Sequence, residues 1–369
     1  MSRDLLLVSI ALFTWGVGES AYFFFQPLYL EALGASPLSI GTIMGAVGIA
    51  MIITHIPAGY LADRFGRRIM MWISWMVGVL SGVIMASARS LPVFTVGAVL
   101  YGVTAFVITP LNSYVTAARG KWSVARALTL TSAAYSSGAI VGPIVGGYIG
   151  ERYDFSNLYL FATCMFLLST IVIFFLKPQP TEKKEANDPQ NKIFKRAYLV
   201  FLPVLFTATL GMYLSQPLAP NFLQNVHHLS ISQIGLLGSV SSTGTVILNL
   251  VIGTLNARTG LILSQVAAGF FPLLLWKGLG LPWFAVAYFM LGGYRAARTV
   301  SIAHIRSLIS TANMGIAYGI AETVSGAAII LAPPLAGFLY ENNPVWIFQS
   351  GLGLSFMALM LTIATIKKT

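Results

Sequence analysis

Long apolar stretches, which follow one another with only short polar breaks between them, constrain the fold of this chain most. Twelve such stretches can be recognised. They cover residues 5–28, 40–61, 69–88, 91–117, 125–150, 156–177, 197–222, 231–256, 261–277, 281–305, 313–340 and 344–366. Because a helix needs about 20 apolar residues to cross the hydrocarbon core of a bilayer, each stretch predicts one spanning helix, although the ninth is short. The sequence therefore predicts an all-α, multi-pass membrane protein.

The composition excludes a soluble fold. Charged residues make up 9% of the chain and apolar residues 56%, with a mean hydropathy of +0.79, whereas soluble domains contain about 25% charged residues. The first apolar stretch begins at Leu5 and continues past Gln26, so it is longer than the hydrophobic region of a secretory signal. We therefore expect it to be retained as the first spanning helix. Cys164 is the single cysteine, so no internal disulfide is possible.

The positive charges predict the orientation of the helices, because lysine and arginine concentrate in the cytoplasmic loops of membrane proteins. With both termini placed in the cytoplasm, 17 of these residues fall in inner loops and tails, and three, Arg89, Arg152 and Lys277, in outer loops. We therefore expect both termini in the cytoplasm. The short loops and tails favour a prokaryotic inner membrane. The net charge of +11 would suggest nucleic acid binding in a soluble protein. Here it indicates basic loops that face anionic membrane lipids, and no nucleic acid partner is expected.

The two halves of the chain are related by duplication, since short segments recur in one order at offsets of 190 or 194 residues. The matched segments are Gln26-Pro27-Leu28 with Gln216-Pro217-Leu218, Ile40-Gly41 with Ile234-Gly235, Gly59, Leu61, Arg64 and Gly66 with Gly253, Leu255, Arg258 and Gly260, and Gly142 to Glu151 with Ala332 to Glu341. Four matches in order predict two homologous six-helix bundles, residues 1–177 and 197–369, arranged as parallel repeats. Residues 178–196 are polar and proline-containing, and they predict a cytoplasmic linker.

A charged segment between the second and third stretches reads Gly59-Tyr-Leu-Ala-Asp-Arg-Phe-Gly-Arg-Arg68. Its charges cannot lie in hydrocarbon, so they predict a tight turn at a membrane face. The segment resembles the loop signature of the major facilitator superfamily of transporters, which joins their second and third helices on the cytoplasmic side. The resemblance implies a fold of twelve transmembrane helices in two pseudo-symmetric six-helix bundles, with a substrate site near mid-membrane.

The resemblance also implies a gating role for this segment. In the superfamily the acidic residue, here Asp63, docks at the inner, N-terminal end of the eleventh helix, which falls near Asn313. A carboxylate is stabilised there by the partial positive charge of the helix N-terminus. Gly59 and Gly66 would allow close helix approach and the tight turn. Three arginines would pair with carboxylates or lipid phosphates: Arg64, Arg67 and Arg68.

The fifth predicted helix carries closely spaced glycines. Gly138, Gly142 and Gly146 recur at four-residue spacing, and Pro143 follows the second of them. Small residues at this spacing let helices pack backbone to backbone, and the proline permits bending. The pattern resembles part of the fifth-helix motif of drug:proton antiporters, but Ala98 stands where such antiporters carry an arginine in the fourth helix. Generic helix packing is therefore the alternative, and the mode of coupling stays open.

Four ionisable residues fall inside predicted spans, where a charge is costly to bury: Glu19, Arg295, Arg298 and Glu322. Glu19 is expected about 20 Å from the inner end of the first helix, and the arginines lie one turn apart on the tenth. In the superfamily the first, fourth, seventh and tenth helices line the cavity, which implies that Glu19 and the arginines face the pathway. Two interpretations stay open. Either a glutamate takes up a proton while the arginines hold a polar or anionic substrate group, or Glu322 and an arginine neutralise each other between adjacent helices.

Two glutamines occupy equivalent positions in the two halves, Gln26 and Gln216. They would bond substrate or satisfy backbone groups that the following prolines leave open. Aromatic residues on the first and tenth helices, among them Trp15, Tyr22 and Tyr294, fit an amphipathic solute better than a sugar. The adjacent pair His227-His228 has no third ligand nearby in sequence, so neither a metal site nor a cofactor is expected.

No catalytic signature is present, and no soluble domain is large enough for an enzyme site. The sequence contains no P-loop, so ATP is not expected to drive transport. It therefore predicts a monomeric secondary active transporter, not an enzyme, which moves a small molecule by alternating access coupled to protons. Export of an amphipathic or anionic solute is the leading hypothesis. The alternatives are a proton-coupled importer of a nutrient such as a sugar or organic acid, and a non-transporting receptor or sensor on the same scaffold.

Overall fold

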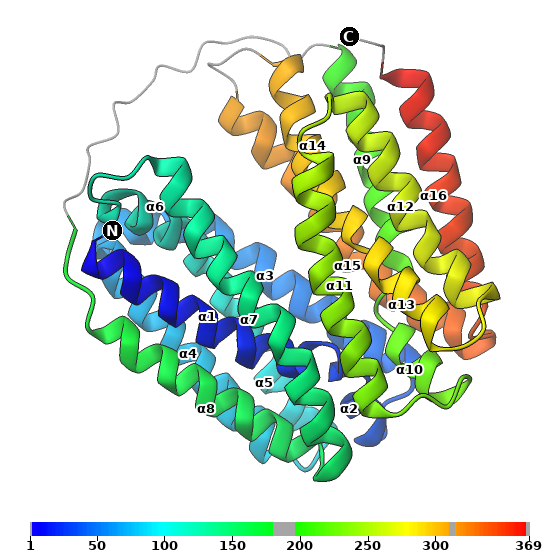
Figure 1. Ribbon diagram of the computed structural model, residues 1–369, viewed down its shortest axis with the longest axis horizontal. Helices are drawn as coiled ribbons and strands as arrows, with labels where there is room; N and C mark the ends of the chain where they lie inside the picture. Colours follow the sequence, from blue (N-terminus) through cyan, green and yellow to red (C-terminus); the bar gives the residue numbers. More distant parts are fainter. Residues whose placement is uncertain (1, 180–195, 310–313, 367–369) are drawn as a thin grey trace. The chain divides into compact units, whose positions relative to one another are not determined.

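The computed structural model describes residues 2–179, 196–309 and 314–366, and there it consists of helices joined by turns (Figure 1). The helices are α1 (Arg3–Phe23), α2 (Gln26–Ala32), α3 (Pro37–Phe65), α4 (Arg67–Ser87), α5 (Leu91–Val103), the 3-10 turn η1 (Thr104–Val107), α6 (Ile108–Ala118), α7 (Val124–Arg152), α8 (Phe155–Phe174), α9 (Arg196–Leu214), α10 (Ala219–Asn225), α11 (Ile231–Ile252), α12 (Ala257–Lys277), α13 (Leu281–Met290), α14 (Gly292–Leu308), α15 (Met314–Asn342) and α16 (Trp346–Thr365). The predicted all-α fold is confirmed.

Eleven of the described helices or helix pairs are long and apolar enough to cross a membrane. The short ninth span is among them, because α12 begins at Ala257 rather than Leu261. The tenth predicted span is formed by two helices, α13 and α14, which meet at Leu291. Neither of them contains an apolar window of 18 residues, because α13 has 10 residues and α14 has 17. Helix α14 also carries Arg295 and Arg298 in its first two turns.

The helix breaks repeat between the two halves of the chain. The first span is interrupted between α1 and α2, and the seventh between α9 and α10. Pro27 and Pro220 lie in the first turn of the short helices that follow, where a residue without a backbone N–H is tolerated. The fourth span also changes geometry, at η1 just after Gly102, and Gly292 at the break in the tenth lies 190 positions later. Equivalent spans therefore share equivalent irregularities.

The chain forms two compact units. The first unit consists of Met1–Ala35, Ala46–Lys183 and His228–Ser239, and the second of Ser36–Gly45, Lys184–His227 and Val240–Thr369. The first turns of α3 and α11 therefore belong to a different unit from the remainder of the same helix. The division into six-helix bundles over 1–177 and 197–369 stays a prediction.

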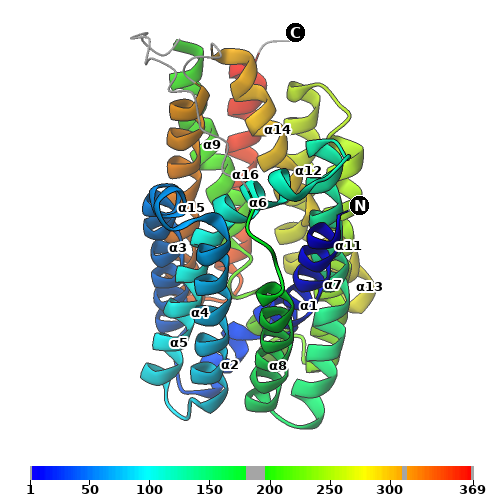
Figure 2. The ribbon, with the colours of Figure 1, turned by 90° about the vertical axis from the view of Figure 1, so that its left-hand side faces the viewer.

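Helix α1 forms the centre of the first unit, where it packs against α7 and α8 (Figure 1). Helix α4 lies beside α5 and also packs against α8 (Figure 2). Aromatic side chains fill the space between these helices. Trp15 stacks on Phe166 with ring centroids 4.3 Å apart, and Tyr22 lies 4.9 Å from Tyr159. These rings are buried, so they hold α1 in place within the unit.

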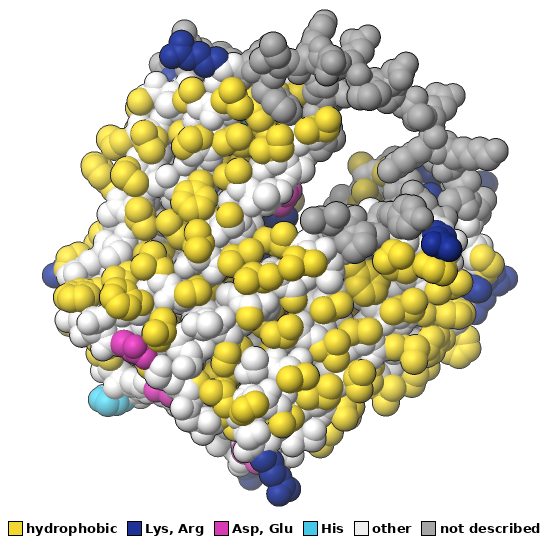
Figure 3. All heavy atoms as spheres, turned by 180° about the vertical axis from the view of Figure 1, so that it is seen from behind, with side chains coloured by type: hydrophobic (Ala, Val, Ile, Leu, Met, Phe, Trp, Pro, Cys, Tyr) yellow, Lys and Arg dark blue, Asp and Glu magenta, His cyan; other side chains and the backbone are white. Residues whose placement is uncertain are grey.

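In the second unit α9 packs against α15 and α16, and α12 packs against α14 and α16. A buried cluster that includes Tyr198, Phe201, Leu261 and Val300 joins α9, α12 and α14. On the molecular face drawn in Figure 3, hydrophobic side chains predominate, and lysine and arginine lie mostly near its margin. A surface of this kind suits contact with lipid, because charged side chains are few over its middle.

Candidate functional site

Glu19 lies on α1, in the first unit, and its side chain is partly buried. The hydroxyl of Tyr135 on α7 donates a hydrogen bond of 2.7 Å to Oε2 of Glu19. The hydroxyl groups of Tyr22 and Tyr101 also interact electrostatically with this carboxylate, and Trp15 donates a 3.2 Å hydrogen bond to Tyr101. Glu19 is therefore an ionisable group set among tyrosine hydroxyls, and a hydroxyl can bond either protonation state of a carboxyl group.

Tyr135 was not singled out from the sequence, although a signal for it exists. It lies three residues before Gly138, so the two share a helix face. The glycines of that face all meet the backbone of α1: Gly138 at Phe13, Gly142 at Val17 and Gly146 at Ala21. From one glycine to the next, the contact moves four residues toward the C-terminus on both α7 and α1, so the two helices run parallel. This is expected, because α1 is the first span and α7 the fifth, and both cross the membrane in the same direction. The same register brings Tyr135 to α1.

The predicted gating segment forms the junction between α3 and α4. Gly66 has a φ of +88°, a conformation that glycine adopts without strain. Arg67 donates a hydrogen bond to the carbonyl of Ser113 (3.3 Å) and Arg68 donates one to the carbonyl of Leu176 (3.2 Å). Arg64 lies over the ring of Phe65, with its guanidinium carbon 5.6 Å from the centroid. The arginines thus contact backbone carbonyls and an aromatic ring of the first unit.

The gating contact itself falls outside the described part of the structure. Gly59 and Asp63 lie in α3, whose backbone is described there, but the Asp63 side chain is not described, and Asn313 lies outside the described residues. The docking of Asp63 at the eleventh span stays a prediction.

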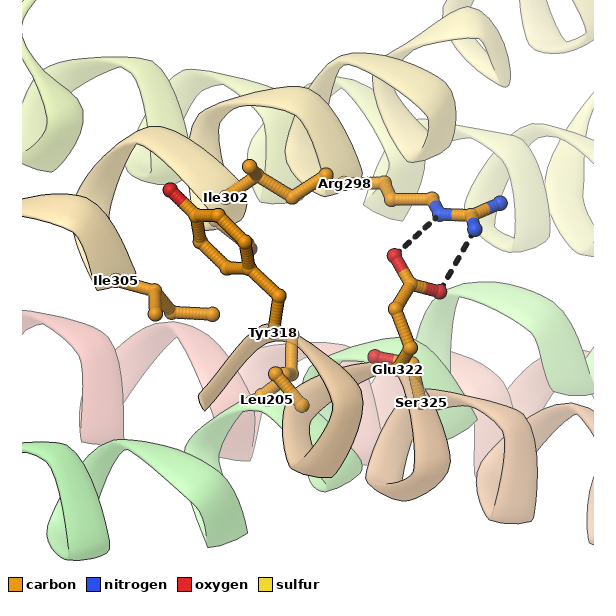
Figure 4. Close-up of a pocket in the computed structure, with 9 residues that line it drawn as sticks. Leu205, Arg298, Ile302, Ile305, Tyr318, Glu322 and Ser325 are labelled. Atoms are coloured by element: carbon orange, nitrogen blue, oxygen red, sulfur yellow. Dashed lines mark hydrogen bonds and ion pairs between the residues drawn. The ribbon is translucent and has the colours of Figure 1, made fainter. Parts of the chain in front are cut away.

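The ionisable residues of the second unit come together on α14 and α15. Arg298 donates to Glu322 through Nε (3.4 Å) and Nη2 (2.7 Å), which gives a two-bond ion pair (Figure 4). Nη2 of Arg298 lies well within the 4.0 Å of an ion pair, and the two side chains are 51% and 45% exposed. The pairing of Glu322 with an arginine was one of the two interpretations that the sequence left open.

The ion pair lines a pocket of ≈ 130 Å³ in the second unit. The rest of the lining is mostly apolar, with polar atoms from three further side chains. The lining residues are Leu205, Arg298, Ser301, Ile302, Ile305, Tyr318, Ala321, Glu322 and Ser325. Figure 4 shows Tyr318 and the aliphatic side chains on one side of the pocket and the ion pair on the other. The arrangement offers both charges and an apolar wall to a small molecule.

Arg295 lies one turn before Arg298 on α14 and is exposed. Two tyrosines flank it, since Tyr294 and Tyr213 interact electrostatically with it and their ring centroids lie 5.7 Å apart. With both arginines and Glu322 ionised, this group of side chains has a formal charge of +1. An excess of positive charge favours a solute that carries a negative or electron-rich group.

The two glutamines differ in what the structure shows of them. Gln216 donates a 2.7 Å hydrogen bond to the carbonyl of Met212, four residues earlier, close to the end of α9. This is the backbone role that the sequence left open for it. Gln26 is buried at the first position of α2. Trp15 and Tyr22 are buried as well, so they pack within the first unit rather than forming an exposed aromatic wall.

Comparison with known proteins places the chain in a family. The sequence profile of the Major Facilitator Superfamily matches residues 8–214 and again 201–369. The chain is 24% identical over 348 residues to multidrug resistance protein 2 of Bacillus subtilis (strain 168), across 86% of this chain and 84% of that protein. It is 25% identical over 288 residues to multidrug resistance protein MdtG of Escherichia fergusonii, across 74% of this chain and 71% of that protein.

Solved structures share the fold. A variant of the nucleoside transporter NupG matches with a TM-score of 0.87 and 15% identity over 99% of this chain and 100% of that one. A bacterial homologue of the human lysosomal transporter Spinster matches with a TM-score of 0.75 and 15% identity over 98% and 96% of the two chains. The chain therefore belongs to the major facilitator superfamily, and it is an integral membrane protein and a secondary transporter.

Proposed function

We propose that this transporter exports amphipathic solutes in exchange for protons. The observation that carries the proposal is the Glu19–Tyr135 pair, in which a titratable carboxylate on α1 lies among tyrosine side chains of α1, α5 and α7. A proton and a cationic solute compete for one carboxylate, because each neutralises the same charge. Competition at a single site produces antiport. The carboxylate binds either a proton or a solute molecule, so the transporter carries the solute in one direction and the proton in the other. The names of the relatives, multidrug resistance proteins, support the export direction.

The pocket beside the Arg298–Glu322 pair supplies a second polar anchor. Its apolar wall, formed by Leu205, Ile302 and Ile305, suits the hydrocarbon part of an amphipathic solute. The two charges of the ion pair suit solutes of either sign. The sequence already indicated an amphipathic or anionic solute, and the pocket chemistry agrees with both classes.

A proton-coupled importer of an organic anion is the second candidate, and the ion pair favours it. A proton that neutralises Glu322 removes the partner of Arg298, so the guanidinium becomes available to an anionic solute. Proton and anion then bind together instead of competing. Cooperative binding of this kind produces symport, in which both move in one direction.

Reconstitution separates the two candidates. The purified protein is reconstituted in liposomes, and a pH gradient is imposed. The probe is either ethidium, a permanently charged aromatic cation, or carboxyfluorescein, an anion. Antiport moves ethidium toward the acidic side, against the proton flow, and we expect this result. Symport moves carboxyfluorescein from the acidic to the alkaline side. Saturable binding without movement of either probe would contradict both candidates and favour a receptor.

The role of the ion pair is tested by binding of carboxyfluorescein. We expect Glu322→Gln to increase the affinity and Arg298→Gln to decrease it, each by up to about five-fold, because the pair is half exposed and screened by water. Arg306→Gln is the matched control, since Arg306 is an exposed arginine at the far end of the same helix. A loss of affinity in the control equal to that of Arg298→Gln would show that surface charge alone binds the anion.

A further inference from the structure

Arg295 lies on α14 of the second unit, inside the tenth span, and its side chain is exposed. It follows Leu281, where α13 begins, by 14 residues, which is about 20 Å along the span and well inside the hydrocarbon core. Arg298, one turn later, is paired with Glu322, but Arg295 has no carboxylate partner among the described residues. A charge at this depth is costly unless something balances it. Arg295 therefore marks a candidate binding site.

Two tyrosines lie beside this arginine. Tyr213, near the end of α9, and Tyr294, next to Arg295 on α14, both interact electrostatically with it. Their ring centroids are 5.7 Å apart, and the ring planes are tilted by 30°. Both side chains are partly exposed, so a solute that reaches the guanidinium also meets two aromatic rings. We call Arg295, Tyr213 and Tyr294 the Arg295 cluster.

The two hydroxyl groups of the cluster are available as hydrogen-bond donors. Elsewhere in the second unit the hydroxyl of Tyr198 donates to the carbonyl of Ala317 at 2.8 Å. Tyr213 and Tyr294 have no such acceptor among the described residues. A hydroxyl donor beside a guanidinium suits an anion, because the charge and the O–H group act on the same acceptor atoms.

The charge balance of the cluster indicates how many negative charges it accepts. Tyr294 also interacts electrostatically with Arg298 and Glu322, so the pair belongs to the same surroundings. Because Arg298 and Glu322 neutralise each other, the remaining charge of +1 belongs to Arg295. A single negative charge balances it, whereas a phosphate monoester carries about two. A carboxylate fits best, since the planar guanidinium offers two parallel N–H groups to its two oxygens.

The rings of the cluster favour an aromatic body next to the carboxylate. Aromatic pairs gain from offset or edge-to-face contacts beyond the area that they bury, and a saturated ring does not. Apolar surface is also close, because Arg298, one turn from Arg295, lines the pocket whose wall includes Leu205 and Ile302. The cluster thus combines one cation, two hydroxyl donors and an apolar surround in a single unit.

We propose that the Arg295 cluster binds the solute and that the solutes of this protein include aromatic monocarboxylates. The inference rests on the proposed transport of amphipathic solutes and names one class among them. Arg295 binds the carboxylate, the hydroxyls of Tyr213 and Tyr294 donate to its oxygens, and the two rings contact the aromatic body. Arg298 contributes less, because Glu322 already occupies its guanidinium.

Equilibrium binding to the purified protein in detergent, measured by calorimetry, tests this without any gradient. The probe is 1-naphthoate. Two matched ligands separate its features: 1-naphthamide keeps the rings and lacks the charge, and decahydro-1-naphthoate keeps the charge and lacks the aromatic rings. For the wild type we expect the amide to bind about ten-fold more weakly than naphthoate, and the saturated acid about two- to ten-fold more weakly.

Arg295→Gln is expected to lower the affinity for naphthoate by about ten-fold or more, because a charged hydrogen-bond donor is lost, and to leave the affinity for naphthamide unchanged. Arg298→Gln should have the smaller effect. Tyr213→Phe, which keeps the ring, should cost about two- to five-fold. Arg306→Gln is again the matched control and should change nothing. The affinity for ethidium should not fall in Arg295→Gln, which separates a lost charge contact from a folding defect.

Three results would overturn the proposal. Naphthoate that fails to bind the wild type saturably, or binds no better than naphthamide, would mean that no carboxylate is recognised; this comparison decides the matter even if Arg295→Gln folds poorly. An unchanged affinity for naphthoate in Arg295→Gln would remove the cluster as the site. A loss in Arg298→Gln as large as in Arg295→Gln would assign the anion to the ion pair. Failure here leaves proton-coupled export through Glu19 standing, since binding without a gradient does not require proton transfer.

Discussion

Glu19→Gln is expected to abolish solute accumulation driven by a pH gradient, down to the level of protein-free liposomes. Glutamine keeps the shape of the side chain and still accepts the hydrogen bond that Tyr135 donates to Glu19 at 2.7 Å, but it cannot bind and release a proton. The exchange of labelled for unlabelled ethidium without a gradient should fall as well, because the cationic solute loses the carboxylate for which it competes with the proton. The measurement is ethidium movement in liposomes, with and without an imposed gradient.

Tyr135→Phe is the matched comparison for this variant. It removes the donor while Glu19 stays titratable, so gradient-driven accumulation should persist at a reduced rate. The loss is expected to be smaller than for Glu19→Gln, because the partly buried carboxylate keeps its contact with water. Gradient-driven accumulation that survives Glu19→Gln would remove Glu19 as the proton site and leave Glu322 as the candidate. Gradient-free exchange that keeps its full rate in Glu19→Gln would mean that the cationic solute does not bind at Glu19.

The sequence predicts the spanning helices well because apolar length is a local property. A run of about 20 apolar residues has one stable arrangement in a bilayer, so eleven spans could be recognised without any knowledge of packing. The tenth span was harder to describe from the sequence. Its helix breaks at Leu291, and the cost of a break is offset by tertiary contacts, such as the backbone of Gly292 against Gly244, which no local pattern reveals.

The candidate site was predictable in its residues but not in its pairings. Arg298 and Glu322 could be chosen because a charge inside a span is costly, yet their partnership depends on how α14 faces α15. Tyr135 escaped notice because tyrosine inside an apolar span carries no such penalty and has no distinctive pattern. Two further hydrogen bonds were only half visible in the sequence. Glu151 and Glu341 belong to the repeat, but the backbone N–H groups of Ser232 and Leu38 that donate to them lie on other helices.

Gly146→Val is expected to prevent normal folding of the first unit. A Cβ at this position would meet the backbone oxygen, carbon and Cα of Ala21 on α1, and a backbone cannot swing aside as a side chain can. The register of α1 on α7 also fixes Gly138 and Gly142 against α1, so relief at Gly146 would disturb both of those contacts. Overpacking usually costs about 1–3 kcal/mol, and we expect a loss at or above the upper end. Thermal unfolding in detergent and the yield of monodisperse protein are the measurements.

Two companion variants determine whether close packing is the cause. Gly269→Ala is the matched control, because nothing lies within 4 Å of the Cβ that it adds to α12; its melting temperature should be unchanged or slightly higher, since alanine favours a helix over glycine by about 1 kcal/mol. Ala21→Gly should fail to rescue Gly146→Val, because the atoms that block the new side chain are backbone atoms, which glycine retains. Rescue by Ala21→Gly, or a Gly146→Val protein with the same melting temperature as the wild type, would mean that α1 and α7 can move apart. The contact would then be a loose one, and the glycine spacing on α7 would not determine how closely the two helices pack.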